Sequence, residues 1–186
     1  MRSALPQIAE QLGADERTLR RAAERGTVRA HRPSPRRLVL APGELDYLRS
    51  HWDLLSRLVR TLRTEPNVAL AALYGSVARG DDRRDSDLDV LVGFRTDHDG
   101  APALLARRLE GVLGRPVDVA RLSRIREQSP LLLLAALDEG RVLVDRDGTW
   151  RDLQEQRTAI ARAARRQERQ ARAQAAASVA QLTAER

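Results

Sequence analysis

The sequence contains no cysteine, which excludes a disulfide scaffold, a metal centre held by thiolates and a thiol nucleophile. Lysine is absent as well, so all 33 cationic side chains are arginine. Aromatic residues make up only 3% of the chain, so its core must consist of Leu, Val, Ile and Ala. Stacking surfaces of the kind that grip single-stranded nucleic acid are therefore not expected.

Membrane and secretion signals are also missing. No apolar run approaches the ~20 residues that a membrane-spanning helix needs. Residues 1–12 lack the apolar stretch of a secretory signal. Three histidines leave little for an imidazole metal site. We expect a soluble cytoplasmic protein with no membrane partner.

The charge is distributed unevenly along a chain of 186 residues, a length that fits one ordinary domain or two small ones. Residues 1–63 carry 13 Arg against 7 acidic residues, residues 64–150 carry 12 against 15, and residues 151–186 carry 8 against 4. The net charge of +7 is therefore the sum of two basic ends and an acidic middle. This asymmetry predicts a polyanion-binding surface near one end and a carboxylate cluster in the middle.

The first 43 residues have the pattern of two short helices and a hairpin. Ile8, Ala9 and Leu12 form an apolar stripe that ends at Gly13, and Asp15 is a suitable N-cap for a second helix. This spacing is typical of a helix-turn-helix. Two short β-like runs then surround a Pro-Ser-Pro turn within residues 27–40, as in a wing.

This region resembles the winged helix-turn-helix modules of the MerR and excisionase type. The alternative is a small helical domain with a solvated basic face. The resemblance implies binding to double-stranded DNA through a polar and basic surface on the second helix and the wing. Its expected members are Arg17, Thr18, Arg20, Arg21, Arg25, Arg29, Arg36 and Arg37.

The rest of the chain is predicted to be α+β. An amphipathic pattern over residues 44–63 predicts a helix, which we place in a connecting segment, 44–66. Residues 67–148 alternate between strand and helix patterns and form a small mixed-sheet domain. Its expected strands are 68–74, 88–94 and 116–120 with an edge strand at 142–144, and its expected helices are 103–113 and 130–140. Residues 149–186 form an Arg, Ala and Gln-rich helical tail, which is either solvated or a surface for a partner.

The acidic middle holds the most informative motif. A buried strand ending at Tyr74 is followed by Gly75-Ser76, where a glycine lets the backbone approach a ligand closely. A helix starting there offers free N–H groups and a hydroxyl to nucleotide phosphates. After ten further residues come Asp87 and Asp89, two apart, so that both carboxylates project from one face of the next strand. Paired carboxylates suit Mg²⁺.

A third carboxylate is expected on the following strand. Asp118 lies among apolar neighbours in Pro-Val-Asp-Val-Ala. Adjacent to the aspartate pair, it would serve as a shared ligand for a second metal or as the base for an attacking hydroxyl. The alternative is a strand-end carboxylate without a role.

Together, these residues resemble the signature of the DNA polymerase β-type nucleotidyltransferase superfamily, and the short domain resembles its minimal nucleotidyltransferase (MNT) group. The resemblance implies that two Mg²⁺ ions and ATP bind, with Asp87, Asp89 and Asp118 as metal-binding and catalytic residues. It further implies that the nucleotide contacts Gly75, Ser76, Arg79 and Ser86.

Members of the MNT group are commonly antitoxins that transfer AMP to a hydroxyl of a HEPN-type toxin. The resemblance therefore implies an adenylyltransferase whose partner is a cognate toxin or another operon neighbour, and whose DNA-binding module regulates their operon. The domain is too short to enclose a small acceptor, although a homodimer could supply the missing wall. Two alternatives remain: a DNA-binding regulator with a non-catalytic nucleotidyltransferase domain, and a nucleotidyltransferase toxin that acts on RNA.

Overall fold

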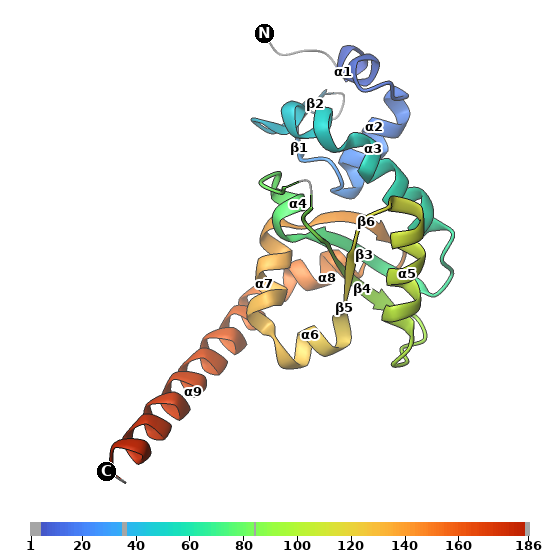
Figure 1. Ribbon diagram of the computed structural model, residues 1–186. Coiled ribbons are helices and arrows are strands. Elements are labelled where there is room, and N and C mark those ends of the chain that lie inside the picture. Colours follow the sequence, from blue (N-terminus) through green and yellow to red (C-terminus); the bar gives the residue numbers. More distant parts are fainter. Residues whose placement is uncertain (1–4, 35–36, 84, 185–186) are drawn as a thin grey trace.

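The structure is a computed structural model that describes residues 5–34, 37–83 and 85–184. It is an α+β protein with a long helix at its C-terminal end (Figure 1). Its helices are α1 (Leu5–Gln11), α2 (Glu16–Arg25), α3 (Glu44–Arg63), α4 (Gly75–Arg79), α5 (Ala101–Leu113), α6 (Leu122–Gln128), α7 (Pro130–Glu139), α8 (Thr149–Glu155) and α9 (Arg157–Ala184). Its strands are β1 (Ala30–Ser34), β2 (Arg37–Leu40), β3 (Val68–Tyr74), β4 (Leu88–Phe94), β5 (Val117–Arg121) and β6 (Arg141–Asp145).

Four strands form a mixed sheet in the order β5-β4-β3-β6. β3 pairs antiparallel with both β4 and β6, whereas β4 and β5 run parallel. The mixed sheet confirms the predicted α+β class, and the predicted strands at residues 68–74, 88–94 and 142–144 are confirmed. The predicted edge strand, β6, lies at one end of the sheet.

Helices cover both faces of this sheet (Figure 1). One face packs against α3 and α5, whose buried side chains include Leu55, Leu58 and Leu109. The other face packs against α7, α8 and the start of α9, where Leu133, Leu153 and Ile160 are buried. The near-absence of aromatic side chains is thus offset by leucine, which fills both layers.

The N-terminal helices have the predicted local structure. The Asp15 carboxylate accepts the Thr18 N–H at 3.1 Å and caps α2, as the sequence indicates. Gly26 ends α2 in the left-handed conformation (φ 90°). β1 and β2 then pair antiparallel.

These helices do not have a separate core. Leu5, Ile8 and Leu19 belong to the same buried cluster as α3 and one face of the sheet. Val142 on β6 also donates its N–H to the Gly26 carbonyl at 3.2 Å. The N-terminal elements and the sheet are therefore directly coupled through α3 and β6.

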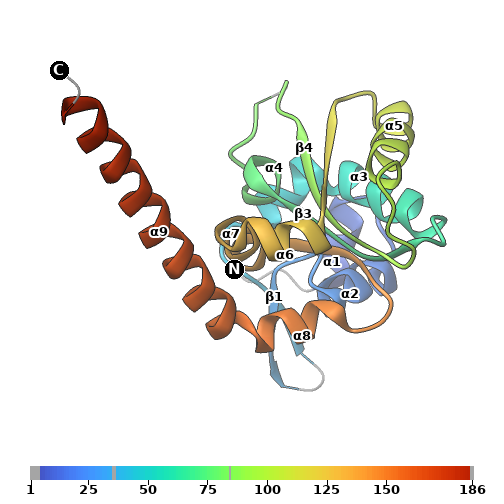
Figure 2. The ribbon, with the colours of Figure 1, turned by 90° about the horizontal axis from the view of Figure 1, so that it is seen from below.

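The C-terminal helix α9 leaves the body of the protein (Figures 1 and 2). Ile160 and Ala164 anchor its first turns, and Gln167 donates to the Gln128 carbonyl at 2.7 Å. Residues 169–176 of α9 are exposed. Among the described residues, no helix is both long and apolar enough to cross a membrane.

Candidate active site

The turn after β3 brings the backbone close to a carboxylate. Gly75 adopts a positive φ of 75° at the start of α4, and Gly80 ends that helix. A Cβ atom at Gly75 would lie 2.2 Å from Oδ2 of Asp89. Only glycine permits this approach, because an L side chain would both strain the backbone and meet the carboxylate.

Strand pairing places the three motif segments side by side. Tyr74, directly before the turn, is the Cα partner of Asp89 on β4. Asp89 is in turn the Cα partner of Asp118 on the parallel strand β5. The sheet thus brings together the glycine turn, Asp89 and Asp118, as predicted from the sequence.

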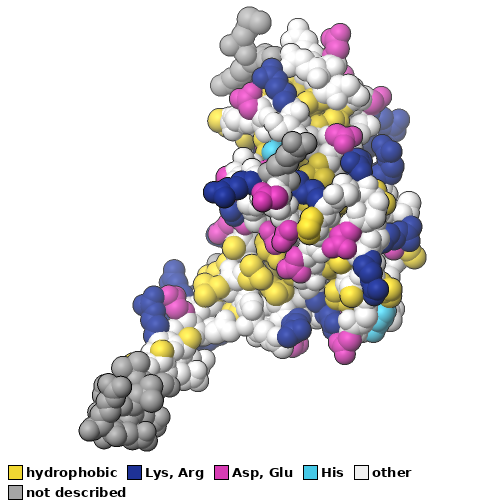
Figure 3. Space-filling model, viewed as in Figure 1, with side chains coloured by type: hydrophobic (Ala, Val, Ile, Leu, Met, Phe, Trp, Pro, Cys, Tyr) yellow, Lys and Arg dark blue, Asp and Glu magenta, His cyan; other side chains and the backbone are white. Residues whose placement is uncertain are grey.

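The electrostatics of this cluster are unfavourable without a cation. Burial, followed by the charges of Asp118 and Asp87, raises the pKa of Asp89 above its usual value. Burial also raises the pKa of Tyr74 to about 12, with further contributions from Asp89 and Asp118. Acidic side chains gather near α4 and the start of β4 in Figure 3. This is the field that a bound divalent cation would neutralise.

The donor chemistry fits Mg²⁺, which prefers carboxylate oxygens together with water and phosphate. Asp87 and Asp118 are exposed, whereas Asp89 is half-buried. No group of three or more His, Cys, Asp or Glu side chains in the described part of the chain is arranged to hold an ion by itself. The aspartates therefore supply only part of a coordination shell, and phosphate oxygens and water would have to complete it.

A residue that the sequence analysis missed, Glu139, lies at the end of α7. Its side chain reaches the turn at Gly75-Ser76, which we call the phosphate turn because the sequence predicts that nucleotide phosphates bind there. Its Oε1 accepts the Gly75 N–H at 2.9 Å, and its Oε2 accepts Nη1 of Arg79 at 2.7 Å. The Glu139 carboxylate is therefore already hydrogen-bonded to the N–H group that is predicted to bind phosphate. No local pattern points to Glu139, because it lies 64 residues from Gly75 in the chain.

Comparisons with known proteins agree with this geometry. Residues 56–149 match the polymerase beta nucleotidyltransferase family. The chain belongs to this family. A search of curated proteins finds no match.

Solved structures with a similar fold come from toxin–antitoxin pairs. A toxin–antitoxin structure with AMP-PNP has 25% identity and a TM-score of 0.50, over 68% of this nucleotidyltransferase and 97% of the other chain. A tri-AMPylated HEPN toxin from Shewanella oneidensis in complex with its MNT antitoxin gives 24% identity, a TM-score of 0.43 and coverages of 69% and 93%. An MntA–HepT toxin–antitoxin structure has 20% identity and a TM-score of 0.41, over 70% of this chain and 95% of the other.

The loop before Asp87 is fixed to the rest of the nucleotidyltransferase. Ser86, a predicted nucleotide contact, accepts the Arg83 N–H on its hydroxyl at 2.8 Å, and its carbonyl accepts from Arg115. Asp82 binds Nε2 of His51 on α3 through Oδ1 at 2.8 Å. Ser86 and Asp82 therefore contribute to holding the loop that leads to Asp87 and Asp89.

Arg79, also predicted to contact the nucleotide, lies on the last turn of α4. In addition to Glu139, it contacts Asp81, with Nε 3.1 Å from Oδ2. Hydrogen bonds to Glu139 and Asp81 raise the pKa of Arg79 further. The side chain is exposed at the rim of the site, within reach of a bound phosphate only if these contacts rearrange.

The predicted DNA-binding residues have different surroundings. Arg17 and Arg37 are exposed and form no ion pair within the described residues, whereas Arg20 pairs with Glu16 at 2.5 Å. Thr18, Arg21 and Arg25 line a pocket between α2 and α3. Arg36 lies outside the described residues.

Arg29, another predicted DNA contact, is half-buried. Its Nη2 donates to the carbonyls of Glu139 at 2.7 Å and Ala78 at 3.4 Å. The guanidinium group is therefore hydrogen-bonded to the nucleotidyltransferase domain, and its contact with DNA stays a prediction. Because Ala78 lies on α4 and Glu139 contacts Gly75, Arg29 links the N-terminal hairpin to both sides of the phosphate turn.

Proposed function

We propose that this protein is a Mg²⁺-dependent adenylyltransferase that transfers AMP from ATP to a hydroxyl of a partner protein, as the antitoxin of a toxin–antitoxin pair. The observation that carries the proposal is the pairing of Asp89 with Asp118 beside the turn at Gly75. The family match supports nucleotidyl transfer. The likeness to a toxin–antitoxin assembly solved with AMP-PNP supports ATP as donor and a toxin as partner. The resemblance of the domain to the MNT group favours a toxin of the HEPN type.

The proposed chemistry assigns each side chain a task. Asp87, Asp89 and Asp118 would hold Mg²⁺, which neutralises charge on the triphosphate when bound. Gly75 and Ser76 bind the phosphates through N–H and hydroxyl donors. The acceptor oxygen forms a bond to the α-phosphorus as the bond to the bridging oxygen breaks, and pyrophosphate leaves with that electron pair. Asp118, which is exposed at the opening, takes the hydroxyl proton.

The open site supports a macromolecular acceptor. Asp87, Asp118 and Arg79 are all exposed. A partner protein can bring its hydroxyl to the aspartates and exclude water as it docks. The exposed part of α9 offers a further surface on which such a partner could lie.

The direct test incubates the protein with α-labelled ATP, Mg²⁺ and the protein encoded beside it. We expect the label on the neighbour and the release of pyrophosphate. The double variant Asp87→Asn, Asp89→Asn should lose transfer, whereas Asp85→Asn, a neutralisation in the same loop, should retain it. If the double variant transfers no label and still neutralises the partner's toxicity, the protein would instead be a non-catalytic binding protein.

We further propose that the N-terminal elements bind double-stranded DNA. The order of two helices and an antiparallel hairpin supports this, as do the exposed Arg17 and Arg37, which form no ion pair with any residue that the structure describes. Substituting both by alanine should weaken binding to the operon DNA and reduce the slope of log K against log[salt] by about 2. Arg107→Ala with Arg124→Ala, two exposed arginines elsewhere, should leave the affinity unchanged. If the variant that lacks Arg17 and Arg37 binds DNA with unchanged affinity, these two arginines do not contact DNA and this proposal is refuted.

A further inference from the structure

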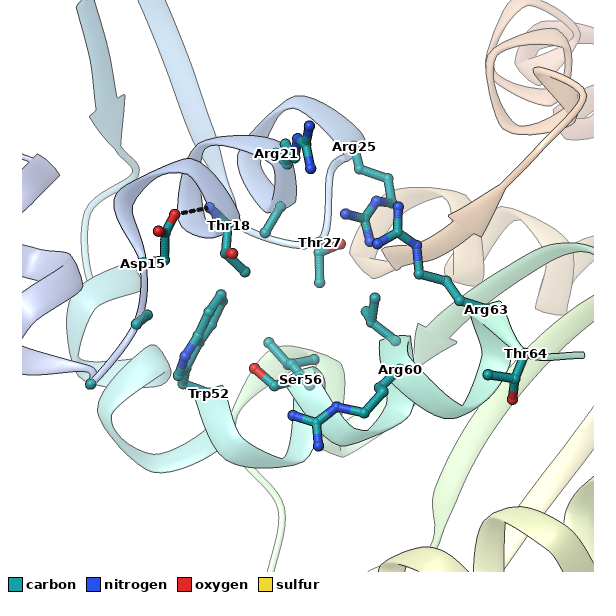
Figure 4. A pocket seen from close by; sticks show the side chains of 15 residues that line it. Asp15, Thr18, Arg21, Arg25, Thr27, Trp52, Ser56, Arg60, Arg63 and Thr64 are labelled. Carbon is teal, nitrogen blue, oxygen red and sulfur yellow. Dashed lines mark hydrogen bonds between the residues drawn. The ribbon is translucent and has the colours of Figure 1, made fainter.

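The pocket between α2 and α3 is separate from the transferase site. It has a volume of about 580 Å³, which lies within the usual range of small-molecule sites. Its wall combines one face of α2, one face of α3 and the turn that joins α1 to α2 (Figure 4). None of the predicted catalytic residues lines it.

This pocket is strongly cationic. Arg21 and Arg25 line it from α2, and Arg60 and Arg63 line it from α3. Figure 4 shows Arg25 and Arg63 pointing toward each other between the two helices. Within the described residues, no carboxylate forms an ion pair with any of these four side chains. The one acidic residue in the wall is Asp15, whose carboxylate already caps α2 through the Thr18 N–H. Four arginines thus line one pocket, and none of them has a carboxylate counter-ion in the part of the chain that the structure describes.

Arg25 lies close enough to Arg63 and Arg21 to be repelled by both. Burial, and then the charges of Arg63 and Arg21, lowers the pKa of Arg25. Arg25 is held in place by a hydrogen bond from Nη1 to the Leu143 carbonyl at 3.1 Å. A bound polyanion would relieve this repulsion, and the planar guanidinium fork matches the oxygens of a phosphate group.

The opposite end of the pocket offers a flat aromatic wall. Trp52 stands there, with the hydroxyl-bearing Thr18 and Ser56 beside it (Figure 4). Along α3, Trp52 and Arg63 are separated by roughly 16 Å at 1.5 Å per residue. This layout has an aromatic face at one end and paired arginines at the other, so it can stack a base and bind a chain of phosphates.

We propose that this pocket binds a nucleotide with two or three phosphates as a regulatory ligand, with its base on Trp52 and its phosphates on Arg21, Arg25, Arg60 and Arg63. This site is independent of the proposed transfer reaction. DNA is a less suitable occupant, because the wall is a hollow between two helices of one chain. Thr18, Arg21 and Arg25 line up at steps of three and four residues on the flank of α2 next to α3.

The test measures binding to the full chain by calorimetry, with ATP, GTP and tripolyphosphate as probes at fixed ionic strength. EDTA is present so that the transferase site lacks its metal. We expect Arg60→Ala with Arg63→Ala to weaken nucleotide binding by about tenfold or more. Arg57→Ala is a control on the same helix and outside the pocket, and should change the affinity less than about twofold. Asp87→Asn with Asp89→Asn should leave it unchanged.

A second measurement uses fluorescence. In a Trp150→Phe background, Trp52 is the remaining tryptophan, and a bound nucleotide should quench it. If tripolyphosphate binds as tightly as ATP and no nucleotide quenches the Trp52 fluorescence, the assignment of the ligand as a nucleotide is overturned. Binding that persists in the arginine double variant but is lost in the aspartate double variant would place the ligand in the transferase site and overturn the proposal.

DNA is tested as the competing occupant. A duplex whose binding is lost in the arginine double variant, and which neither ATP nor tripolyphosphate displaces, would make the pocket a DNA-backbone contact and overturn the proposal. Displacement of the duplex by the nucleotide supports it. The arginine double variant should still adenylylate the partner protein. Loss of nucleotide binding at the pocket can therefore be distinguished from failure of the proposed transfer reaction.

Discussion

The carboxylate of Glu139 accepts the N–H of Gly75 at 2.9 Å and so occupies the position at which a triphosphate oxygen is expected. Its second oxygen accepts from Arg79 at 2.7 Å. A nucleotide that binds the turn must displace Glu139 from both donors. We therefore predict that Glu139 competes with a nucleotide that binds at this turn.

Replacing Glu139 with glutamine should strengthen nucleotide binding. The amide keeps the shape of the side chain but removes the charge that holds it on Gly75 and Arg79. Because the pair lies at the surface, we expect the dissociation constant for AMP-PNP with Mg²⁺ to fall about two- to fivefold. The control is Asp138→Asn, since the neighbouring Asp138 pairs with Arg157 instead. Weaker binding in the glutamine variant would show that Glu139 assists the nucleotide.

Gly75→Ala should destabilise the protein and abolish transfer. The new Cβ would meet Oδ2 of Asp89 at 2.2 Å, and φ is 75°. Gly114→Ala is the matched control, because Gly114 has a φ of 70° and open space around its Cβ position. We expect backbone strain of about 1 kcal/mol in both variants, and an additional loss in Gly75→Ala that urea denaturation can measure. Equal losses would mean that Asp89 moves aside without cost.

Asp89→Asn should stabilise the metal-free protein while removing activity. Folding raises the pKa of Asp89 through burial and through Asp118 and Asp87. The charged carboxylate therefore opposes folding above its folded pKa, and this penalty disappears as pH falls below its unfolded pKa. We expect a gain of up to about 1 kcal/mol at pH 7 in EDTA, shrinking as the solution is acidified through that interval.

The control for this prediction is Asp85→Asn, an exposed neutralisation in the same loop. Its unfolding free energy should follow that of the unmodified protein across the same pH range. A loss of stability in Asp89→Asn at neutral pH would show that Asp89 is already well compensated.

Glu44→Gln should lower the free energy of unfolding, because it breaks a buried ion pair between the N-terminal elements and the sheet. Arg141 and Glu44 form a bidentate pair at 2.6 and 3.0 Å and are 1% and 3% exposed, respectively. The Arg141 guanidinium also lies 3.4 Å from the centre of the Tyr47 ring. Removing one partner of a buried pair costs about 3–5 kcal/mol. Asp46→Asn on the same helix breaks only an exposed pair with Arg49 and should cost less than about 1 kcal/mol.

Calorimetric unfolding distinguishes the two variants. A similar small change in both would show that the buried pair contributes little net stability. A large effect of Glu44→Gln should also reach the transferase site, because Arg141 donates from Nε to the Ala78 carbonyl on α4 at 2.8 Å.

Local sequence patterns predicted much of the fold. The amphipathic segment at residues 44–63 is the helix α3, Asp15 caps α2, and the strands at 68–74 and 88–94 have the predicted bounds. Helix α6 was not predicted, because its seven residues contain no buried side chain and so no apolar stripe. The proximity of Asp118 to Asp89 was also predictable, since consecutive strands of such a domain often pair.

The amino-acid sequence by itself determined the glycine turn, the two aspartates after it and the third on the next strand, because each depends on the conformation and spacing of a few neighbouring residues. Only the tertiary structure decided that Glu139 sits on the turn, that Arg29 faces inward and that four arginines share a pocket. Those contacts join residues dozens of positions apart. They depend on how α3, α7 and β6 pack, which no local pattern encodes.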